Sequence, residues 1–203
     1  MNQIPGQLAG ATRTNRDFLR SGNGVIQVQG VIDAANSYDG VNTSYERELR
    51  PGTIMAQITS SKKWVPCKRT KANGAGSTAT ALTVYDARSF KTTDTIKVGS
   101  NNTCAISSIN YSTNVITLAA TKTWSDGDAV YCDSSAGSEI ARAVLNEWVN
   151  LLDYDGVARD KTTGRLVIAG LAYSGVALGD LTNILAATNY LTQIAWDNQQ
   201  GVA

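Results

Sequence analysis

Hydrophobic and polar positions alternate most regularly in residues 50–68, RPGTIMAQITSSKKWVPCK. Pro51 and Gly52 suit the two corners of a tight turn, because Pro fixes φ and Gly tolerates a positive φ. On one side of the strand that follows lie Ile54, Ala56 and Ile58, and on the other lie Thr53, Met55, Gln57 and Thr59. This period of two predicts a half-buried strand, and residues 64–66 (WVP) predict a returning edge strand, since Pro cannot donate to a ladder. We expect a hairpin with one dry face, whose core residues are Pro51, Gly52, Ile54, Ile58 and Trp64.

Short apolar runs predict a second group of strands further along the chain. They occupy residues 82–85, 95–98, 104–109, 115–118 and 129–132. Short strands at such regular spacing are typical of a small barrel or sandwich, and Phe90 is the expected anchor of the first long loop. Joints rich in Gly, Ser and Ala at residues 70–80 and 133–138 bracket the group and predict flexible connections. We therefore expect residues 75–136 to form a small β module inserted into a core made by residues 50–74 and 137–203.

The first 49 residues lack a comparable pattern and hold many Gly, Asn, Gln, Ser and Thr residues. Only the run VIQVQGV, residues 25–31, alternates briefly. We interpret residues 1–49 as an extended arm carrying one strand that is able to add to a neighbour's sheet edge. The alternative, a disordered tail, would leave Phe18, Leu19 and the Val/Ile run in solvent.

The C-terminal third leaves more than one interpretation open. In residues 139–152 a helical spacing runs through Ile140, Val144, Leu145 and Trp148, and an alternating one through Ala141, Ala143 and Leu145. Pattern alone slightly favours the helix. Residues 166–176 are apolar and fit a strand pair or one kinked strand. Asp180 is a good N-cap for a short helix over residues 181–187, and residues 190–196 fit a closing strand or more helix.

Composition describes a foldable chain with few charges: 42% of the 203 residues are hydrophobic and 17% are charged. The length permits one large domain or two small ones. A net charge of +1 gives no reason to expect attraction to nucleic acid or to an anionic membrane. The charge is uneven, however, since residues 1–80 carry ten Lys/Arg against five Asp/Glu. This asymmetry fits either ordinary surface scatter or a basic arm that meets an acidic partner.

Three cysteines, Cys67, Cys104 and Cys132, are widely spaced and form no CxxC motif. They do not resemble a disulfide scaffold or a zinc site, and we expect them to be reduced and mostly buried, as after synthesis in a cytoplasm. The chain shows no charged segment followed by an apolar one near its start, and no long apolar run. Neither a signal peptide nor a membrane span is therefore expected.

The sequence holds little that suggests catalysis. It contains no histidine, which removes His-based triads, Cys–His pairs and imidazole metal sites. The Walker, dinucleotide-binding and GxSxG patterns are absent as well. We expect no enzyme activity, no cofactor and no metal.

Two acidic loops and the tryptophans deserve separate consideration. The loops contain Asp126, Asp128 and Asp133 in one case, and Asp153, Asp155 and Asp160 in the other. Structural turns are favoured over a cation site, because the remaining oxygen ligands of a calcium loop are missing. Core or interface packing is likewise the preferred role of Trp64, Trp124, Trp148 and Trp196, ahead of a stacking platform.

The hairpin, with its R-P-G-T entry and aromatic-Val-Pro exit, resembles the head decoration proteins of tailed bacteriophages, the lambda-type capsid cement family. The resemblance resumes in ARAVLNEWVNL from Ala141 and in GRLVIAGLAYSGVALGDL, residues 164–181. It implies a strand in residues 139–152 that pairs with the hairpin. It also implies a mainly β fold: a small β-barrel or sandwich (β-tulip-like) core with an inserted β module, an extended N-terminal arm and a short C-terminal helix.

The same resemblance implies a structural virion protein rather than an enzyme. Such a protein is made in the host cytoplasm, binds the major capsid protein on the outer capsid surface as a homotrimer at threefold and quasi-threefold positions, and stabilises the shell. The expected capsid-binding residues of the arm are Arg13, Arg16, Phe18, Leu19, Arg20, Val25, Ile26 and Val28. An alternative is a carbohydrate-binding or host-attachment module of a phage particle, with Trp124 or Tyr131 on the inserted barrel as its contact.

Overall fold

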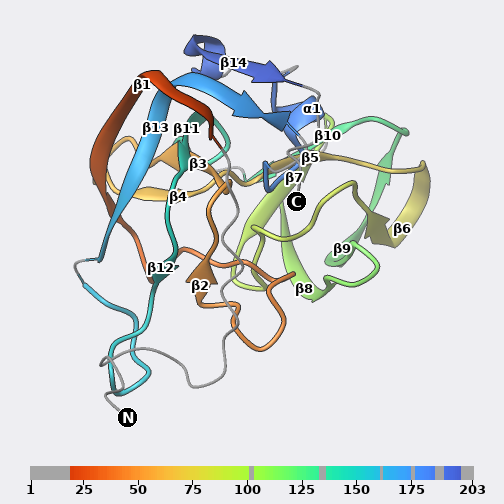
Figure 1. The fold of residues 1–203 in the computed structure, drawn as a ribbon. Helices are drawn as coiled ribbons and strands as arrows, with labels where there is room; N and C mark the ends of the chain where they lie inside the picture. The colour runs from red at the N-terminus through yellow and green to blue at the C-terminus, as the bar shows by residue number, and fades with distance from the viewer. Residues whose placement is uncertain are drawn as a thin grey trace.

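A computed structural model describes residues 19–100, 103–132, 136–160, 162–174, 177–185 and 190–197. These residues form a mainly β fold, as the sequence predicts. Two small barrels lie side by side in Figure 1, one built from the two ends of the chain and the other from its middle.

The first barrel is closed by the pairing of early and late strands. Its strands are β1 (Leu19–Ile32), β3 (Ile54–Gln57), β4 (Trp64–Pro66), β11 (Ala141–Leu145) and β13 (Thr162–Tyr173). The sheet order is β1-β4-β3-β11-β13, and β1 also pairs with β13, which completes the ring. A further strand, β14 (Ile194–Asp197), lies parallel to the end of β13. The ring is therefore closed between β1 and β13, while β1 meets β4 only where Ile32 pairs with Trp64.

The second barrel uses strands that follow one another in the chain. They are β5 (Arg69–Lys71), β6 (Gly76–Thr83), β7 (Thr95–Val98), β8 (Cys104–Asn110), β9 (Val115–Trp124) and β10 (Ala129–Cys132). Their order is β5-β10-β7-β8-β9-β6, and a bridge between Ala72 and Val84 brings the two outer strands together. The predicted strands at residues 95–98 and 129–132 coincide with β7 and β10.

The predicted flexible joint before this group differs from the structure. Residues 70–80 hold most of β5 and the start of β6, so the barrel begins before the expected boundary at residue 75. Gly76 suggested flexibility, but it serves close packing, because a Cβ there would lie 2.4 Å from the Trp124 ring. Small residues in this strand thus make room for an aromatic side chain.

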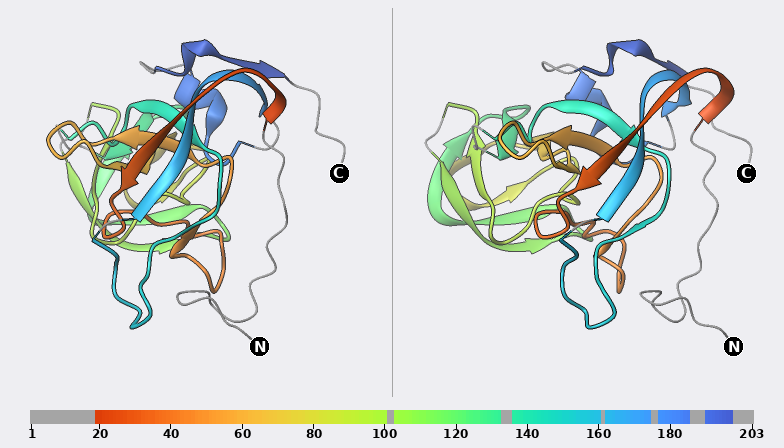
Figure 2. Two further views of the ribbon diagram at one scale, coloured as in Figure 1. Left: turned by 60° about the vertical axis from the view of Figure 1, so that its left-hand side comes forward. Right: turned by 90° about the vertical axis from the view of Figure 1, so that its left-hand side faces the viewer.

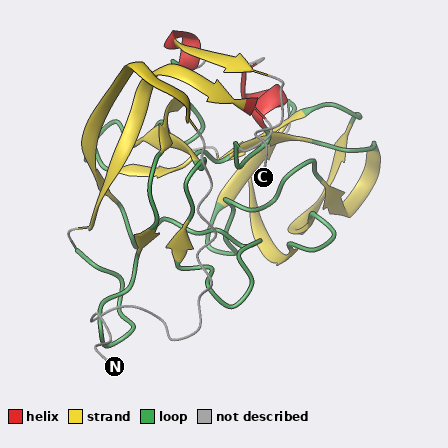
Figure 3. Ribbon diagram, viewed as in Figure 1, coloured by secondary structure: helices red, strands yellow, loops and turns green. Residues whose placement is uncertain are grey.

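The shorter elements lie at the ends of the first barrel. Strands β2 (Glu48–Leu49) and β12 (Val149–Asn150) pair with each other. Helices α1 (Leu181–Leu185) and η2 (Leu191–Gln193) lie at the end that also holds β14 (Figure 3). The Asn183 backbone N–H donates to Asp180 Oδ1 at 3.4 Å, which supports the predicted N-cap. The strand interpretation of residues 139–152 is confirmed by β11, and β13 is one strand with a positive φ at Gly170.

The hairpin has two dry faces rather than one. Ile54 and Ala56 join one apolar cluster, which α1, η2 and β14 cover, while Met55 joins a second with Trp64 and Leu166. Both faces are dry because each is covered by one of these two apolar clusters. Trp64 is buried as expected, whereas Ile58 is only half-buried. Pro51 and Gly52 form the expected turn, with a φ of 90° at Gly52.

The segment predicted as an arm divides into different parts. Residues 1–18 lie outside the described residues. The next stretch forms β1 and pairs with β13 of the same chain. Ile32, Ala34 and Leu49 are fully buried among the residues of the first barrel. The segment from Ile32 to Leu49 is therefore anchored in the first barrel rather than in an arm, a correction that sequence patterning missed because its buried apolar residues are isolated and have no regular period.

Candidate functional site

The outer side of β1 is the clearest candidate for contact with another molecule. Its pairing with β13 runs from Leu19–Ala172 to Ile32–Thr162 and is regular from Gln27 onward. On the opposite edge, the described residues show a single pairing, between Ile32 and Trp64. Ile26, Val28 and Val31 are 51%, 38% and 40% exposed. A strand with one open edge and exposed β-branched side chains is a template for binding another chain.

The structure separates the eight predicted arm residues. Arg13, Arg16 and Phe18 lie outside the described residues, and Arg20 is placed only as part of the β1 backbone. Leu19 and Val25 pack against the apolar cluster under β14 and α1, so they stabilise the fold. Ile26 and Val28 remain exposed. Val31 is also exposed, on the opposite face of the strand from Val28, and was missed although it lies in the same VIQVQGV run.

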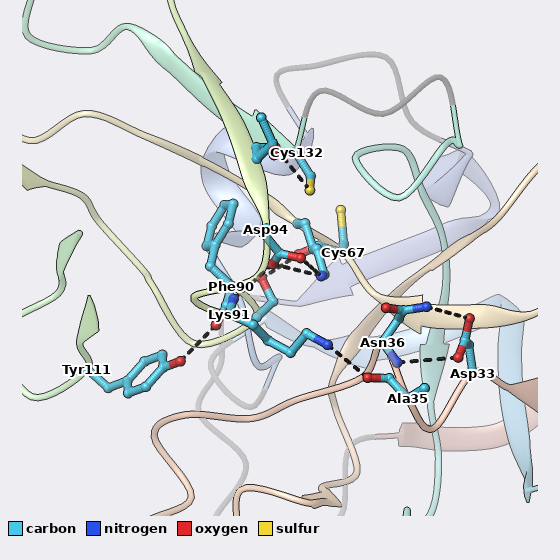
Figure 4. Close-up of polar contacts among 12 residues, drawn as sticks. Asp33, Ala35, Asn36, Cys67, Phe90, Lys91, Asp94, Tyr111 and Cys132 are labelled. Carbon is cyan, nitrogen blue, oxygen red and sulfur yellow. Dashed lines mark hydrogen bonds and ion pairs between the residues drawn. The ribbon is translucent and has the colours of Figure 1, made fainter. Parts of the chain in front are cut away.

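A second candidate is the junction between the barrels, which is held by a buried ion pair. Lys68 Nζ, between β4 and β5, lies 2.6 Å and 2.7 Å from the two carboxylate oxygens of Asp94, just before β7. The side chains are 4% and 9% exposed. Asp94 Oδ2 also accepts the Lys91 backbone N–H at 2.8 Å (Figure 4). No sequence pattern predicted this pair, because its members lie in different loops.

The ion pair lines a cavity of about 360 Å³, with Cys132, Thr95 and Ser138 nearby. Burial raises the pKa of Cys132 to about 11, and Asp94 adds to the effect. Burial also raises the pKa of the neighbouring Cys67 to about 12. Both thiols therefore stay protonated and are poor nucleophiles at neutral pH. Because Lys68 and Asp94 neutralise each other's charge, the junction is suited to joining the barrels rather than to acid–base chemistry.

The cysteines and the acidic loops play structural parts where they are described. All three cysteines are free and buried, as expected. Asp126 Oδ1 accepts the Gly74 N–H, and Asp153 Oδ1 accepts the N–H groups of Asp155 and Val157. Within the described part of the chain, no three His, Cys, Asp or Glu side chains gather as metal ligands would.

The predicted glycan-contact residues offer little surface. Trp124 is buried, and its Nε1 donates to the Gly74 carbonyl at 3.0 Å. Tyr131 lies under the Arg69 guanidinium, 5.4 Å from the ring centroid. Neither ring is arranged as an open stacking platform.

The fold and the junction define a mainly β protein made of two joined barrels. None of the helices in the described residues has the length and apolar character needed to cross a bilayer. The chain matches no family model, and comparisons with curated proteins and with solved structures give no match either.

Proposed function

We propose that this protein is a structural virion protein that binds the outer surface of a phage capsid as a homotrimer and stabilises the shell. The observation that carries the proposal is the sparsely paired edge of β1, beside which the side chains of Ile26, Val28 and Val31 are exposed. The resemblance of the hairpin to the capsid cement family points in the same direction.

The sparsely paired edge of β1 is suited to strand addition. A strand that already pairs with β13 on one side is held rigid, so little conformational entropy is lost when a partner strand adds to the other side. The exposed β-branched side chains of Ile26, Val28 and Val31 would then be partly removed from water by the added chain. In a trimer the contact is repeated, and separating the shell requires several such contacts to break together.

The test is co-sedimentation with expanded, undecorated heads of tailed phages. Val28→Lys and Ile26→Lys each place a charge on the exposed edge, and we expect binding to weaken by at least about tenfold. The control is Val41→Lys, because Val41 is 39% exposed, almost the same as Val28, and lies in a loop away from β1. If the β1 variants and the control bind equally well, the edge is not the contact.

The alternative function, a glycan-binding module, is tested by a separate binding measurement. Wild-type protein that ignores capsids but binds members of a glycan panel would replace the proposal. Light scattering of the free protein and of protein released from particles tests the trimer.

A further inference from the structure

A concave site between the barrels has a chemistry that capsid binding does not use. It has a volume of about 280 Å³ and is lined by Tyr38 and Arg47 from the segment between β1 and β2, and by Lys91, Thr92, Thr93 and Tyr111 from the second barrel. Both barrels thus contribute side chains. The site depends on their junction.

Two cations face this site without a carboxylate partner. Arg47 Nη2 donates to the Ala34 carbonyl at 2.6 Å, and Lys91 Nζ donates to the Ala35 carbonyl at 2.8 Å (Figure 4 for Lys91). Among the described residues, neither side chain has an ion pair within 4.0 Å. Arg47 Nε is buried and has no hydrogen-bond partner there. Neutral carbonyls hold the cations in place but leave their charge uncompensated.

The pKa shifts of Arg47 and Lys91 also indicate that their positive charges are poorly compensated. Burial lowers the pKa of Arg47, and it is also the largest cause that lowers the pKa of Lys91. The positive charges of Lys68 and Arg47 lower the Lys91 pKa further, while Asp94 and Asp33 oppose them. Glu46 is a further negative charge and acts on the two tyrosines. An anion between Arg47 and Lys91 would offset the cost of burying the two charges and their repulsion of each other.

The aromatic walls complete the site. The ring centroids of Tyr38 and Tyr111 lie 5.7 Å apart with an interplanar angle of 38°. The Tyr111 hydroxyl donates to the Phe90 carbonyl at 2.9 Å, which fixes its position (Figure 4). Burial raises the pKa of both phenols, so they are neutral at physiological pH and do not repel an anion.

We propose that this site, formed by Arg47 and Lys91 beside the paired rings of Tyr38 and Tyr111, binds a small oxyanion such as phosphate or a carboxylate. The Arg47 guanidinium and Lys91 Nζ are the donors, since both are cations that form charge-assisted hydrogen bonds with oxyanions. The volume is sufficient for inorganic phosphate or a small organic acid. Binding would connect the two barrels through a second ionic contact besides Lys68–Asp94.

The experiment titrates inorganic phosphate into the full-length protein and follows backbone amide NMR signals, with sodium chloride at equal ionic strength as the blank. We expect saturable shifts at Thr92 and Thr93 and a rise of the melting temperature with phosphate concentration. Lys91→Met should weaken binding by at least about tenfold, since it keeps the aliphatic stem and removes the charge. Lys91→Arg, which keeps the charge, should bind within a few-fold of wild type.

Lys97→Met is the matched control, because Lys97 lies on the same barrel and does not line the site. It should bind phosphate as wild type does. Unshifted Thr92 and Thr93 signals in phosphate, or equal binding by wild type and Lys91→Met, would overturn the proposal. If Lys91→Met does not fold, Lys91→Arg still tests the proposal. A well-folded Lys91→Arg protein that does not bind phosphate would overturn the proposal.

Discussion

Lys68 Nζ contacts both carboxylate oxygens of Asp94, at 2.6 Å and 2.7 Å, where the two barrels meet. Lys68 follows the hairpin of the first barrel, and Asp94 precedes β7 of the second. A charge buried on one barrel is thus neutralised by the other. The relative placement of the barrels is coupled to the stability of the fold at this contact.

Removing one partner of the pair should be strongly destabilising. Lys68→Met leaves the Asp94 carboxylate buried without its counter-charge, and we expect a loss of about 3–5 kcal/mol in the free energy of unfolding. The double variant Lys68→Met/Asp94→Leu should recover much of this loss. Urea titrations of the single and double variants measure the coupling. Arg165→Met is the control: its pair with Glu147 is largely exposed and should contribute less than about 1 kcal/mol.

The two hairpin residues differ in burial and should differ in cost. Trp64→Ala removes a buried ring from the first barrel, with an expected loss of about 3–5 kcal/mol. Ile58 is half-buried beside the junction cavity, so Ile58→Ala should cost less than about 2 kcal/mol. Thermal melts compare both with Ser60→Ala in the exposed turn, which should change stability by about 0.5 kcal/mol or less. A Trp64→Ala melt like that of wild type would contradict the role of the hairpin.

Gly30 is required for space rather than for an unusual φ. A Cβ at this position would lie 2.5 Å from Leu166 Cδ1 and from Trp64 Cδ1. Gly30→Ala should therefore cost about 1–3 kcal/mol through overpacking. Gly24→Ala provides the contrast, because its Cβ meets nothing within 4 Å but its φ is +73°. Its cost of about 1–2 kcal/mol would come from backbone conformation alone. Suppression of the Gly30→Ala defect by Trp64→Phe would confirm the steric cause.

Burial of the thiols predicts a loss of stability at alkaline pH. Cys67 and Cys132 have folded pKa values of about 12 and about 11, above the ordinary thiol value of 9.0. Folding therefore favours the protonated thiol. This contribution is fully present below about pH 9 and disappears as the pH rises through the folded values. Urea midpoints between pH 7 and pH 11 should fall.

The Cys67→Ala variant isolates the thiol from other groups in this pH range. The raised pKa values of Tyr38 and Tyr111 act in the same direction, and the lowered pKa of Lys91 acts in the opposite one. Because these groups are unchanged in the variant, its midpoints should fall less steeply with pH than those of wild type. Parallel curves for the two proteins would show that the Cys67 thiol contributes nothing.

The second barrel should be removable. Its apolar cluster is made of residues between Ala72 and Val130, with none from the first barrel. The Lys68 N–H donates to the Ser138 carbonyl at 2.9 Å, so the ends of the segment are adjacent. Replacing residues 68–137 by Gly-Ser-Gly should leave a protein that melts cooperatively. A broad, non-cooperative melt, or loss of near-ultraviolet dichroism, would show that the first barrel depends on the second.

The local sequence pattern predicted those strands whose tertiary surroundings agree with that pattern. The alternation at residues 95–98 and 129–132 corresponds to β7 and β10, and Phe90 is fully buried as its anchor role requires. In residues 139–152 the local spacing favoured a helix. The strand β11 forms because Ala141, Val144 and Leu145 lie between β3 and β13, a tertiary effect that a single segment does not encode.

The candidate sites were harder to predict for a related reason. Ile26 and Val28 lie in a visible pattern, so an exposed strand could be anticipated, but its pairing with β13 could not. Arg47, Lys91 and the Lys68–Asp94 pair come from loops that are distant in sequence. Loop residues follow no regular hydrophobic pattern, so the sequence does not show which of them lie close together in the folded protein.

The closure of the first barrel by β1 and β13 has a consequence for folding during synthesis. The second barrel is contiguous in sequence, so it is able to form as soon as β10 has left the ribosome. The first barrel must wait, because Ile32 pairs with Thr162 and loop closure over that distance is slow. Until β13 emerges, β1 has neither of its edges protected (Figure 2 shows how closely the two strands run together). The nascent chain is therefore most prone to aggregation in this interval, and slower translation before β13 would lengthen it.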